Sequence, residues 1–234
     1  MVPAAARLGR QAGLAGALAR LETRLHRRAE EVRPPGRAGP AAVTGDLVIG
    51  DDAKARCFWG GSSPEYAAYH DDEWGKPVRG DDALFERLTL EAFQSGLSWI
   101  TILRKRPAFR AAFDDFAIAK VAAYREADAT RLMADPGIVR NRMKVDAALH
   151  NARVAAELAP GELTDLLWSF APPARTRPST RADVPATTPE STAMAKALKK
   201  RGFKFVGPTT AYALMQATGM VDDHLTGCWV PVLR

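Results

Sequence analysis

Residues 196–219, which read KALKKRGFKFVGPTTAYALMQATG, predict a helix, a short hairpin and a second helix. Gly202 suits the position that follows a helix C-terminus, and Gly207 suits a tight turn. Pro208 suits the first position of the next helix, where its missing N–H leaves no hydrogen bond unmade. The pattern therefore predicts either a hairpin module that binds DNA or an ordinary corner between two packed helices.

The start of the second helix in this stretch carries groups that suit a phosphate. The first amides of a helix have no partner inside the helix and attract anions. Helix–hairpin–helix modules hold one DNA strand through such contacts without reading its bases. We therefore expect contacts to the DNA backbone from Lys204, Gly207, Thr209 and Thr210.

From residue 82 onward, apolar residues recur at helical spacing, as in Leu84, Phe85 and Leu88. No convincing alternating pattern of a strand is present, so the expected fold class is all-α. Pro107 and the segments 135–137 and 171–173 are expected to separate the helices. The polar, Pro-rich segment 172–191 is expected to be a surface loop.

The N-terminal part of the chain differs in composition from the rest. Residues 1–50 are rich in Ala, Gly, Arg and Pro and contain no aromatic residue. Leucines at helical spacing predict an amphipathic helix within residues 8–31, followed by a linker at 32–42. We expect residues 1–50 to be a loosely ordered bacterial extension, or the result of a start codon assigned too far upstream. Residues 51–234 are expected to form the functional domain.

Composition and charge narrow the function classes. The chain has 234 residues, of which 47% are hydrophobic and 26% charged, as in ordinary globular proteins. It contains no apolar run long enough to cross a bilayer, so no membrane association is expected. Residues 1–40 hold eight arginines and three glutamates, which leaves a formal charge of only +1 on the remainder. A DNA-binding face must therefore come from local basic clusters such as 104–106, 140–144 and 199–204, unless these are simply solvated helix faces.

The two cysteines each have a histidine near them in the sequence. Cys57 precedes His70, and His224 precedes Cys228 by four positions, which predicts both side chains on one face of a helical turn. Two readings remain open. The cysteines are either a disulfide or unrelated buried thiols, or all four residues form a structural Cys2His2 zinc site.

Residues 57–75, CFWGGSSPEYAAYHDDEWG, concentrate aromatic side chains outside any apolar helical pattern. Aromatic residues usually belong to the core. An enzyme that extracts a base from duplex DNA, however, needs flat rings between which the base can stack. The candidate residues for such a pocket are Tyr66, Tyr69, Trp59, Trp74 and Trp99.

Glu91 interrupts the apolar face of the helix expected around LTLEAFQSGLSW (88–99). A carboxylate inside such a face is either exposed to solvent or kept there for a function. Glu91 is therefore the candidate polar group of the pocket.

Five segments together resemble the bacterial 3-methyladenine DNA glycosylase I family of the helix–hairpin–helix superfamily. They occur in order over nearly the whole of residues 56–228. They are residues 57–75, LEAFQSGLSWITIL (90–103), GIVRNRMKV (137–145), ALKKRGFKFVGPTT (197–210) and DDHLTGC (222–228). Phe58 and Met143 depart from the family pattern.

The resemblance implies an all-α, helix–hairpin–helix-type fold in which one structural Zn²⁺ joins the two ends of the domain. The implied ligands are Cys57, His70, His224 and Cys228. The implied base pocket comprises Tyr66, Tyr69, Trp99 and Glu91, with Trp59 and Trp74 nearby. Glu91 is the expected catalytic residue, and Asp223 is the alternative, because related glycosylases carry a catalytic aspartate shortly after the hairpin.

The implied activity is excision of 3-methyladenine from alkylated double-stranded DNA. The enzyme would flip the nucleotide out and hydrolyse its N-glycosidic bond. The alternative is a non-catalytic damage-recognition protein with the same fold. We expect a monomer in the bacterial cytoplasm.

Overall fold

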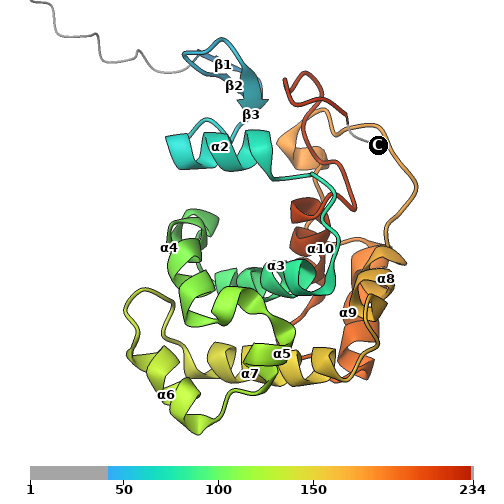
Figure 1. Cartoon of the computed structure of the whole chain (residues 1–234). Coiled ribbons are helices and arrows are strands. Elements are labelled where there is room, and N and C mark those ends of the chain that lie inside the picture. Colours follow the sequence, from blue (N-terminus) through green and yellow to red (C-terminus); the bar gives the residue numbers. More distant parts are fainter. Residues whose placement is uncertain (1–41, 233–234) are drawn as a thin grey trace, which may run out of the picture. The chain divides into compact units, whose positions relative to one another are not determined.

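The computed structural model describes residues 42–232, which belong to one compact unit (Figure 1). The helix predicted within residues 8–31 lies outside the described residues. So does the predicted linker 32–42, except for its last residue. No helix of the described part is long and apolar enough to cross a membrane.

A small antiparallel sheet opens the described part of the chain, with strand order β1-β2-β3. Its strands are β1 (Ala42–Thr44), β2 (Leu47–Ile49) and β3 (Ala55–Cys57). The expectation of a purely α-helical fold is therefore wrong for this segment, because strands of three residues are too short to show an alternating pattern. The boundary that we expected after residue 50 falls inside the sheet, since Val48 of β2 pairs with Arg56 of β3.

The rest of the described chain is mostly helical. Its α-helices are α2 (Pro64–Asp72), α3 (Asp81–Gln94), α4 (Trp99–Ala112), α5 (Ile118–Ala122), α6 (Glu126–Ala134), α7 (Arg142–Ala156), α8 (Glu162–Trp168), α9 (Pro189–Lys200) and α10 (Pro208–Ala217). Helix α4 runs through Pro107, so the expected break there is wrong. Ile102 precedes that proline in the helix and Phe109 follows it; both are fully buried, and their burial offsets the lost hydrogen bond.

Helix α3 occupies the centre of this arrangement and packs against α4, α7, α8 and α10 (Figure 1). Leu84, Phe85 and Leu88 recur on its inner face and are almost completely buried. Its C-terminal end is fixed by the buried Lys144 of α7. The Lys144 Nζ donates to the carbonyl oxygens of Phe93 (2.9 Å) and Ser95 (2.6 Å), which no longer have partners within the helix.

Helices α9 and α10 are joined by the short connection predicted from the sequence and pack against each other. Gly202 follows the end of α9 with φ of +95°, and Pro208 is the first residue of α10. Gly207 caps α10 in an extended conformation, so no left-handed turn is needed there. The Asn151 side chain of α7 holds the connection by bonding both the N–H (2.8 Å) and the C=O (2.9 Å) of Lys204.

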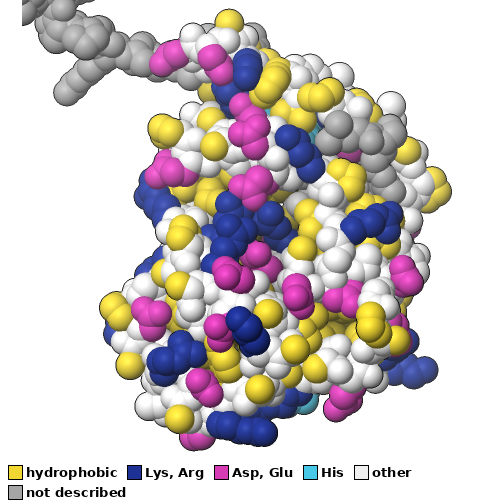
Figure 2. Space-filling view, in the orientation of Figure 1, with side chains coloured by type: hydrophobic (Ala, Val, Ile, Leu, Met, Phe, Trp, Pro, Cys, Tyr) yellow, Lys and Arg dark blue, Asp and Glu magenta, His cyan; other side chains and the backbone are white. Residues whose placement is uncertain are grey.

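Charged side chains of both signs lie together on the face shown in Figure 2, where Lys and Arg gather in the middle with Asp and Glu beside them. A charged group also joins the segment after α2 to α3 and α4. Glu73 accepts hydrogen bonds from Arg106 at 2.6 Å and from Arg87 at 2.9 Å. These arginines bind the segment after α2 to the helices that follow it.

Candidate functional site

A cavity of about 410 Å³ lies where the segment 57–74, the ends of α3 and α10, and the C-terminal loop meet. The structure brings every predicted pocket residue to its wall. These residues are Trp59, Tyr66, Tyr69, Trp74, Glu91 and Trp99, and the alternative candidate Asp223 also lines the cavity. The cavity is large enough for a purine base, and six of the fifteen residues that line it are aromatic.

The aromatic wall is built of rings in mutual contact. The Trp59 ring packs edge-on against Tyr66 and Trp74, with centroids 5.6 and 5.0 Å apart. Tyr69 lies 5.4 Å from Trp99 in a tilted arrangement. The Tyr66 hydroxyl accepts a hydrogen bond from the backbone N–H of Ile100 at 3.0 Å, which ties α2 to the start of α4. These contacts hold the rings in place before any ligand enters.

Glu91 lies in the last turn of α3 and is only 6% exposed. Among the described residues, its carboxylate has neither a hydrogen-bond nor an ion-pair partner. Burial raises its pKa from 4.5 to about 8, while the positive charge of Arg87 acts in the opposite direction. A buried carboxyl group without a partner inside a cavity is suited to a ligand that brings its own positive charge or N–H donors.

Asp223 lies in the segment that follows α10. Its side chain is fully buried and its oxygens are occupied. Oδ2 accepts from the Tyr212 hydroxyl at 2.5 Å and from Gln216 Nε2 at 2.9 Å, and Oδ1 accepts from Arg175 Nη2 at 2.5 Å. Asp223 therefore fastens three segments together and has little capacity left for a reacting group.

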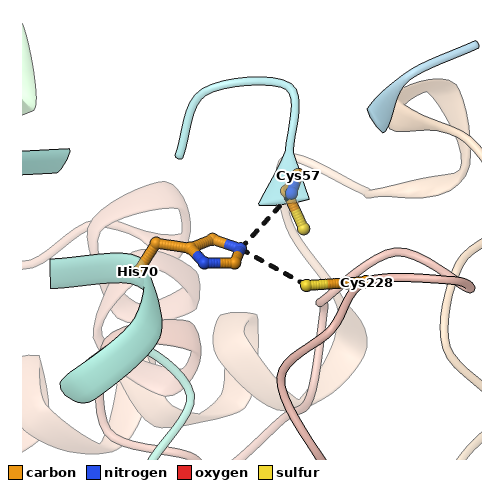
Figure 3. Close-up of side chains that lie close together, drawn as sticks. All are labelled: Cys57, His70 and Cys228. Atoms are coloured by element: carbon orange, nitrogen blue, oxygen red, sulfur yellow. Dashed lines mark hydrogen bonds between the residues drawn. The ribbon is translucent and has the colours of Figure 1, made fainter. Parts of the chain in front are cut away.

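A second cluster lies beside the aromatic wall. The ligand atoms of Cys57, His70 and Cys228 all lie within 4.8 Å of one another (Figure 3). The His70 Nε2 is 3.6 Å from Cys228 Sγ and 3.4 Å from the backbone nitrogen of Cys57. A hydrogen bond from the Cys57 thiol lowers the pKa of Cys228 to about 4, and the same interaction raises the pKa of Cys57. Both cysteines are free, so the structure does not contain the disulfide considered above.

His224, the fourth predicted ligand, lies next to this cluster, but its ring nitrogens are not among the ligand atoms that lie within 4.8 Å of one another. Its ring centroid is 4.9 Å from that of His70. Its Nε2 is buried and has no hydrogen-bond partner in the described part of the chain, while its Nδ1 is 2.9 Å from Asp222 Oδ1. His70 is oriented in the same way, with Nδ1 2.9 Å from Asp71 Oδ1. A carboxylate on one ring nitrogen that leaves the other free is the usual arrangement of metal-binding histidines.

Two glycines leave room for these histidine rings. A Cβ on Gly60 would lie 2.7 Å from the His70 ring, and a Cβ on Gly75 would lie 2.7 Å from His224 Cε1. Any larger residue at either position would displace a ring.

The predicted helical turn between His224 and Cys228 is wrong. Residues 224–228 form a loop with a turn at Gly227, whose φ is +87°. The spacing of four resembles a helix in sequence, but a left-handed residue inside the interval prevents one.

The cavity also has wall residues that the sequence analysis did not single out as pocket residues. They are Phe58, Gln94, Arg181, Val184, Ala213, Gln216 and Leu225. Arg181 and Val184 come from the segment expected only as a surface loop, and nothing in their local pattern indicates a site. Leu225 could have been found, because it directly follows His224.

The four predicted DNA-backbone residues lie together around the start of α10. Lys204, Gly207 and Thr209 are exposed and Thr210 is half-buried. None of them lines the cavity, but α10 reaches it through Ala213 and Gln216. Helix α10 thus runs from the exposed α9–α10 connection to the cavity wall.

Comparison with known proteins gives consistent matches. Residues 59–231 match the family model of methyladenine glycosylase. DNA-3-methyladenine glycosylase 1 of Escherichia coli (strain K12) is 49% identical over 177 residues, which cover 74% of this chain and 95% of that protein. A crystal structure of 3-methyladenine DNA glycosylase I matches with a TM-score of 0.71 and 46% identity, over 74% of this chain and 98% of the other. A variant of such an enzyme in complex with 3-methyladenine matches with a TM-score of 0.69 and 38% identity, over 74% and 96% of the two chains.

Proposed function

This chain belongs to the methyladenine glycosylase family, and from that premise we propose that it excises 3-methyladenine from alkylated double-stranded DNA. It is a hydrolytic base-excision glycosylase. The observation that carries the proposal is the aromatic cavity with Glu91 as its unpartnered carboxylate.

The chemistry of the damaged nucleotide explains why such a cavity suffices. Methylation at N3 gives adenine a positive charge while it is attached to deoxyribose, so the glycosidic bond is already weak. When that bond breaks, its electron pair moves to the base, which leaves as neutral 3-methyladenine. Water adds to the sugar carbon and releases a proton to solvent. No acid is needed to protonate the base, and the protein mainly has to select and hold it.

Two features of the cavity select the cationic base. Aromatic faces attract a cation by about 0.5 to 2 kcal/mol, which favours alkylated over normal adenine. The Glu91 carboxylate supplies an acceptor for the N–H groups of the base edge and a negative charge near the cation. In the protein without ligand the pKa of Glu91 is raised. A cation that enters the cavity lowers this pKa and so favours the ionised carboxylate.

Release of the free base distinguishes this proposal from a non-catalytic DNA-binding protein on the same fold. Purified protein should liberate 3-methyladenine from methylated duplex DNA, as chromatography of the soluble products would show. A protein that binds methylated DNA but leaves every base attached would favour the alternative.

We further propose that Cys57, His70, His224 and Cys228 hold one structural Zn²⁺. Two thiols and two imidazoles are a donor set that zinc prefers, and the unpartnered Nε2 of His224 supports the fourth ligand. When bound, the ion would fasten the C-terminal loop to α2. With the loop fastened in this way, α2 would hold Tyr66 and Tyr69 on one side of the cavity and the loop would hold Leu225 on the other.

Metal analysis of protein purified without chelator tests the zinc proposal directly. We expect one equivalent of zinc per chain, and loss of the metal with strong destabilisation in Cys228→Ala, since structural zinc contributes about 10 to 16 kcal/mol in small peptides. Thermal unfolding gives a readout that does not depend on activity. Zinc content well below one equivalent in folded wild-type protein would contradict the assignment.

We also propose that the α9–α10 connection is a helix–hairpin–helix module that binds the DNA backbone. The exposure of Lys204, Gly207 and Thr209 at the start of α10 supports this role. Lys204→Ala should weaken binding of damaged and undamaged DNA alike and reduce the salt slope by about one unit. Lys120→Ala, which removes an exposed lysine of α5, is the matched control. A loss confined to damaged DNA would place Lys204 in base recognition instead.

We expect the protein to act as a monomer in the bacterial cytoplasm, where its DNA substrate lies. Sedimentation of the protein with and without DNA would test the monomer.

A further inference from the structure

Arg181 is the one basic side chain among the described residues that line the cavity. It is exposed, and no described residue forms an ion pair or a hydrogen bond with its guanidinium group. The other arginine near this wall, Arg175, is bound to Asp223. The cavity therefore carries a positive charge that has no ion-pair partner among the described residues. The base-binding role proposed for the aromatic wall does not involve Arg181.

Two contacts fix the position of Arg181. Its guanidinium carbon lies 4.7 Å from the centroid of the Phe58 ring, which is itself 39% exposed. Its backbone N–H donates to Asp46 Oδ2, between β1 and β2, at 2.7 Å. Stacking on a ring restricts the side chain while leaving the N–H groups of the guanidinium free to donate.

This arrangement draws on residues that lie outside the matched family region. Asp46 and Phe58 both precede residue 59, where that region begins. Phe58 is also one of the two positions that depart from the family pattern in the sequence. Arg181 itself lies inside the matched region, so the arrangement joins one residue of that region to two residues that precede it.

We propose that Arg181, held over Phe58, binds a DNA phosphate next to the flipped nucleotide. The proposal rests on the proposed function, because it takes a DNA strand at the cavity as given. A nucleotide of 3-methyladenine carries a positive base and a negative phosphate. The cavity has its charges in the complementary places. The Glu91 carboxyl group is buried inside it, and the Arg181 guanidinium lies where the cavity meets solvent. A guanidinium fork matches a phosphate group, whereas it would repel the cationic base.

Arg181→Ala tests the contact through binding. The probe is duplex DNA with a stable abasic-site analogue, followed by fluorescence anisotropy over a range of salt concentrations. We expect about 3- to 10-fold weaker binding and a salt slope smaller by about one unit. Phe58→Ala should weaken binding less, about 2- to 3-fold, and Phe58→Trp should restore it, because only the ring is needed to orient the arginine.

Arg79→Ala is the matched control. Arg79 lies over the ring of Trp168 at 4.1 Å, so the variant also removes one positive charge and one cation–π pair, but away from the cavity. Its DNA binding and salt slope should equal those of the wild type.

A second measurement separates a phosphate contact from a base contact. Inhibition by free 3-methyladenine, which has no phosphate, should be the same for Arg181→Ala and the wild type. Loss of that inhibition would move Arg181 into base recognition, and an unchanged salt slope would overturn the proposal. Failure of the wild type to release any base would overturn the proposed function, while the anisotropy result would still decide the role of Arg181.

Discussion

Glu91 and Asp223 line the same cavity, but their carboxylates differ in what surrounds them. Glu91 is contributed by the central helix α3 and lacks a hydrogen-bond or ion-pair partner among the described residues. Asp223 is contributed by the segment after α10 and accepts hydrogen bonds from Tyr212, Gln216 and Arg175. One carboxyl group is held by packing alone and the other by a complete polar network.

The difference indicates a division of roles. A buried group without partners is costly in the free protein and gains most when a complementary ligand arrives. A carboxylate whose bonds are already made gains little from a ligand, and its removal mainly harms the structure. The contrast favours the prediction that Glu91 recognises the base and that Asp223 supports the cavity structurally. It is also a physical argument for Glu91 over the alternative candidate Asp223 as the catalytic residue.

The largest effect is expected from Asp223→Ala, on stability. The substitution leaves the buried Tyr212 hydroxyl without its acceptor and Arg175 without its counter-charge. We expect the free energy of unfolding in urea to fall by about 3 to 5 kcal/mol. Excision measured per folded molecule should fall less than in the Glu91 variant. A stable but inactive Asp223→Asn protein would reverse the two roles.

Glu91→Gln should have the next largest effect, on excision. The variant keeps the shape of the side chain, but it loses the negative charge and replaces one acceptor with a donor. Hydrogen bonds to charged groups contribute about 1.5 to 3 kcal/mol, so single-turnover release should slow by about 10- to 150-fold. Circular dichroism and metal content should not change. Wild-type speed in this variant would show that the cavity assignment is misplaced.

The pH dependence of stability should reveal the environment of Glu91. Its pKa in the folded protein, about 8, lies above its ordinary value of 4.5, so only the folded state retains the proton between these values. The contribution to stability is complete below about pH 4.5 and is lost as the pH rises towards 8, by at most about 1.4 kcal/mol per pH unit. Urea unfolding of wild type and Glu91→Gln at several pH values isolates this contribution. Parallel curves for the two proteins would mean that Glu91 has a solvated or paired carboxylate.

The smallest effect is expected for Gln216→Met, which removes one of the three donors to Asp223 while roughly preserving volume. Loss of a single hydrogen bond from a side chain that lines the cavity should reduce the free energy of unfolding by about 1 kcal/mol. A reduction as large as that of Asp223→Ala would show that the network acts as one unit. No reduction would show that Tyr212 and Arg175 alone satisfy the aspartate.

Much of this site could be predicted from the sequence, because its parts carry local signals. Tryptophans among Gly, Ser and Pro, and a glutamate inside an apolar helical face, both indicated a cavity. The connection between α9 and α10 also has local signals, in Gly202 and Pro208. The cavity wall confirms that the aromatic residues and Glu91 lie together. Their roles remain predictions.

The remaining features depend on contacts between distant segments. The sheet at residues 42–57 is held by the pairing of its strands. These strands are too short to show an alternating pattern of apolar residues in the sequence. The bonds of Asp223 come from residues 7 to 48 positions away, so the sequence could not separate it from Glu91 as a catalytic candidate. Arg181 reaches the cavity only because its loop folds back near the first strands.

The cluster of Cys57, His70 and Cys228 has a consequence for the order in which the protein becomes active during translation. The backbone of Leu225 contacts Cys57 across 168 positions of sequence, so this contact closes a very long loop. Chains emerge from the ribosome with the N-terminal end first. The aromatic segment 57–75 is therefore made early and must wait for residues 223–228 before its cavity has both walls. A nascent chain that lacks residues 223–228 cannot make the contact between Leu225 and Cys57, and its cavity lacks the wall residues Asp223 and Leu225.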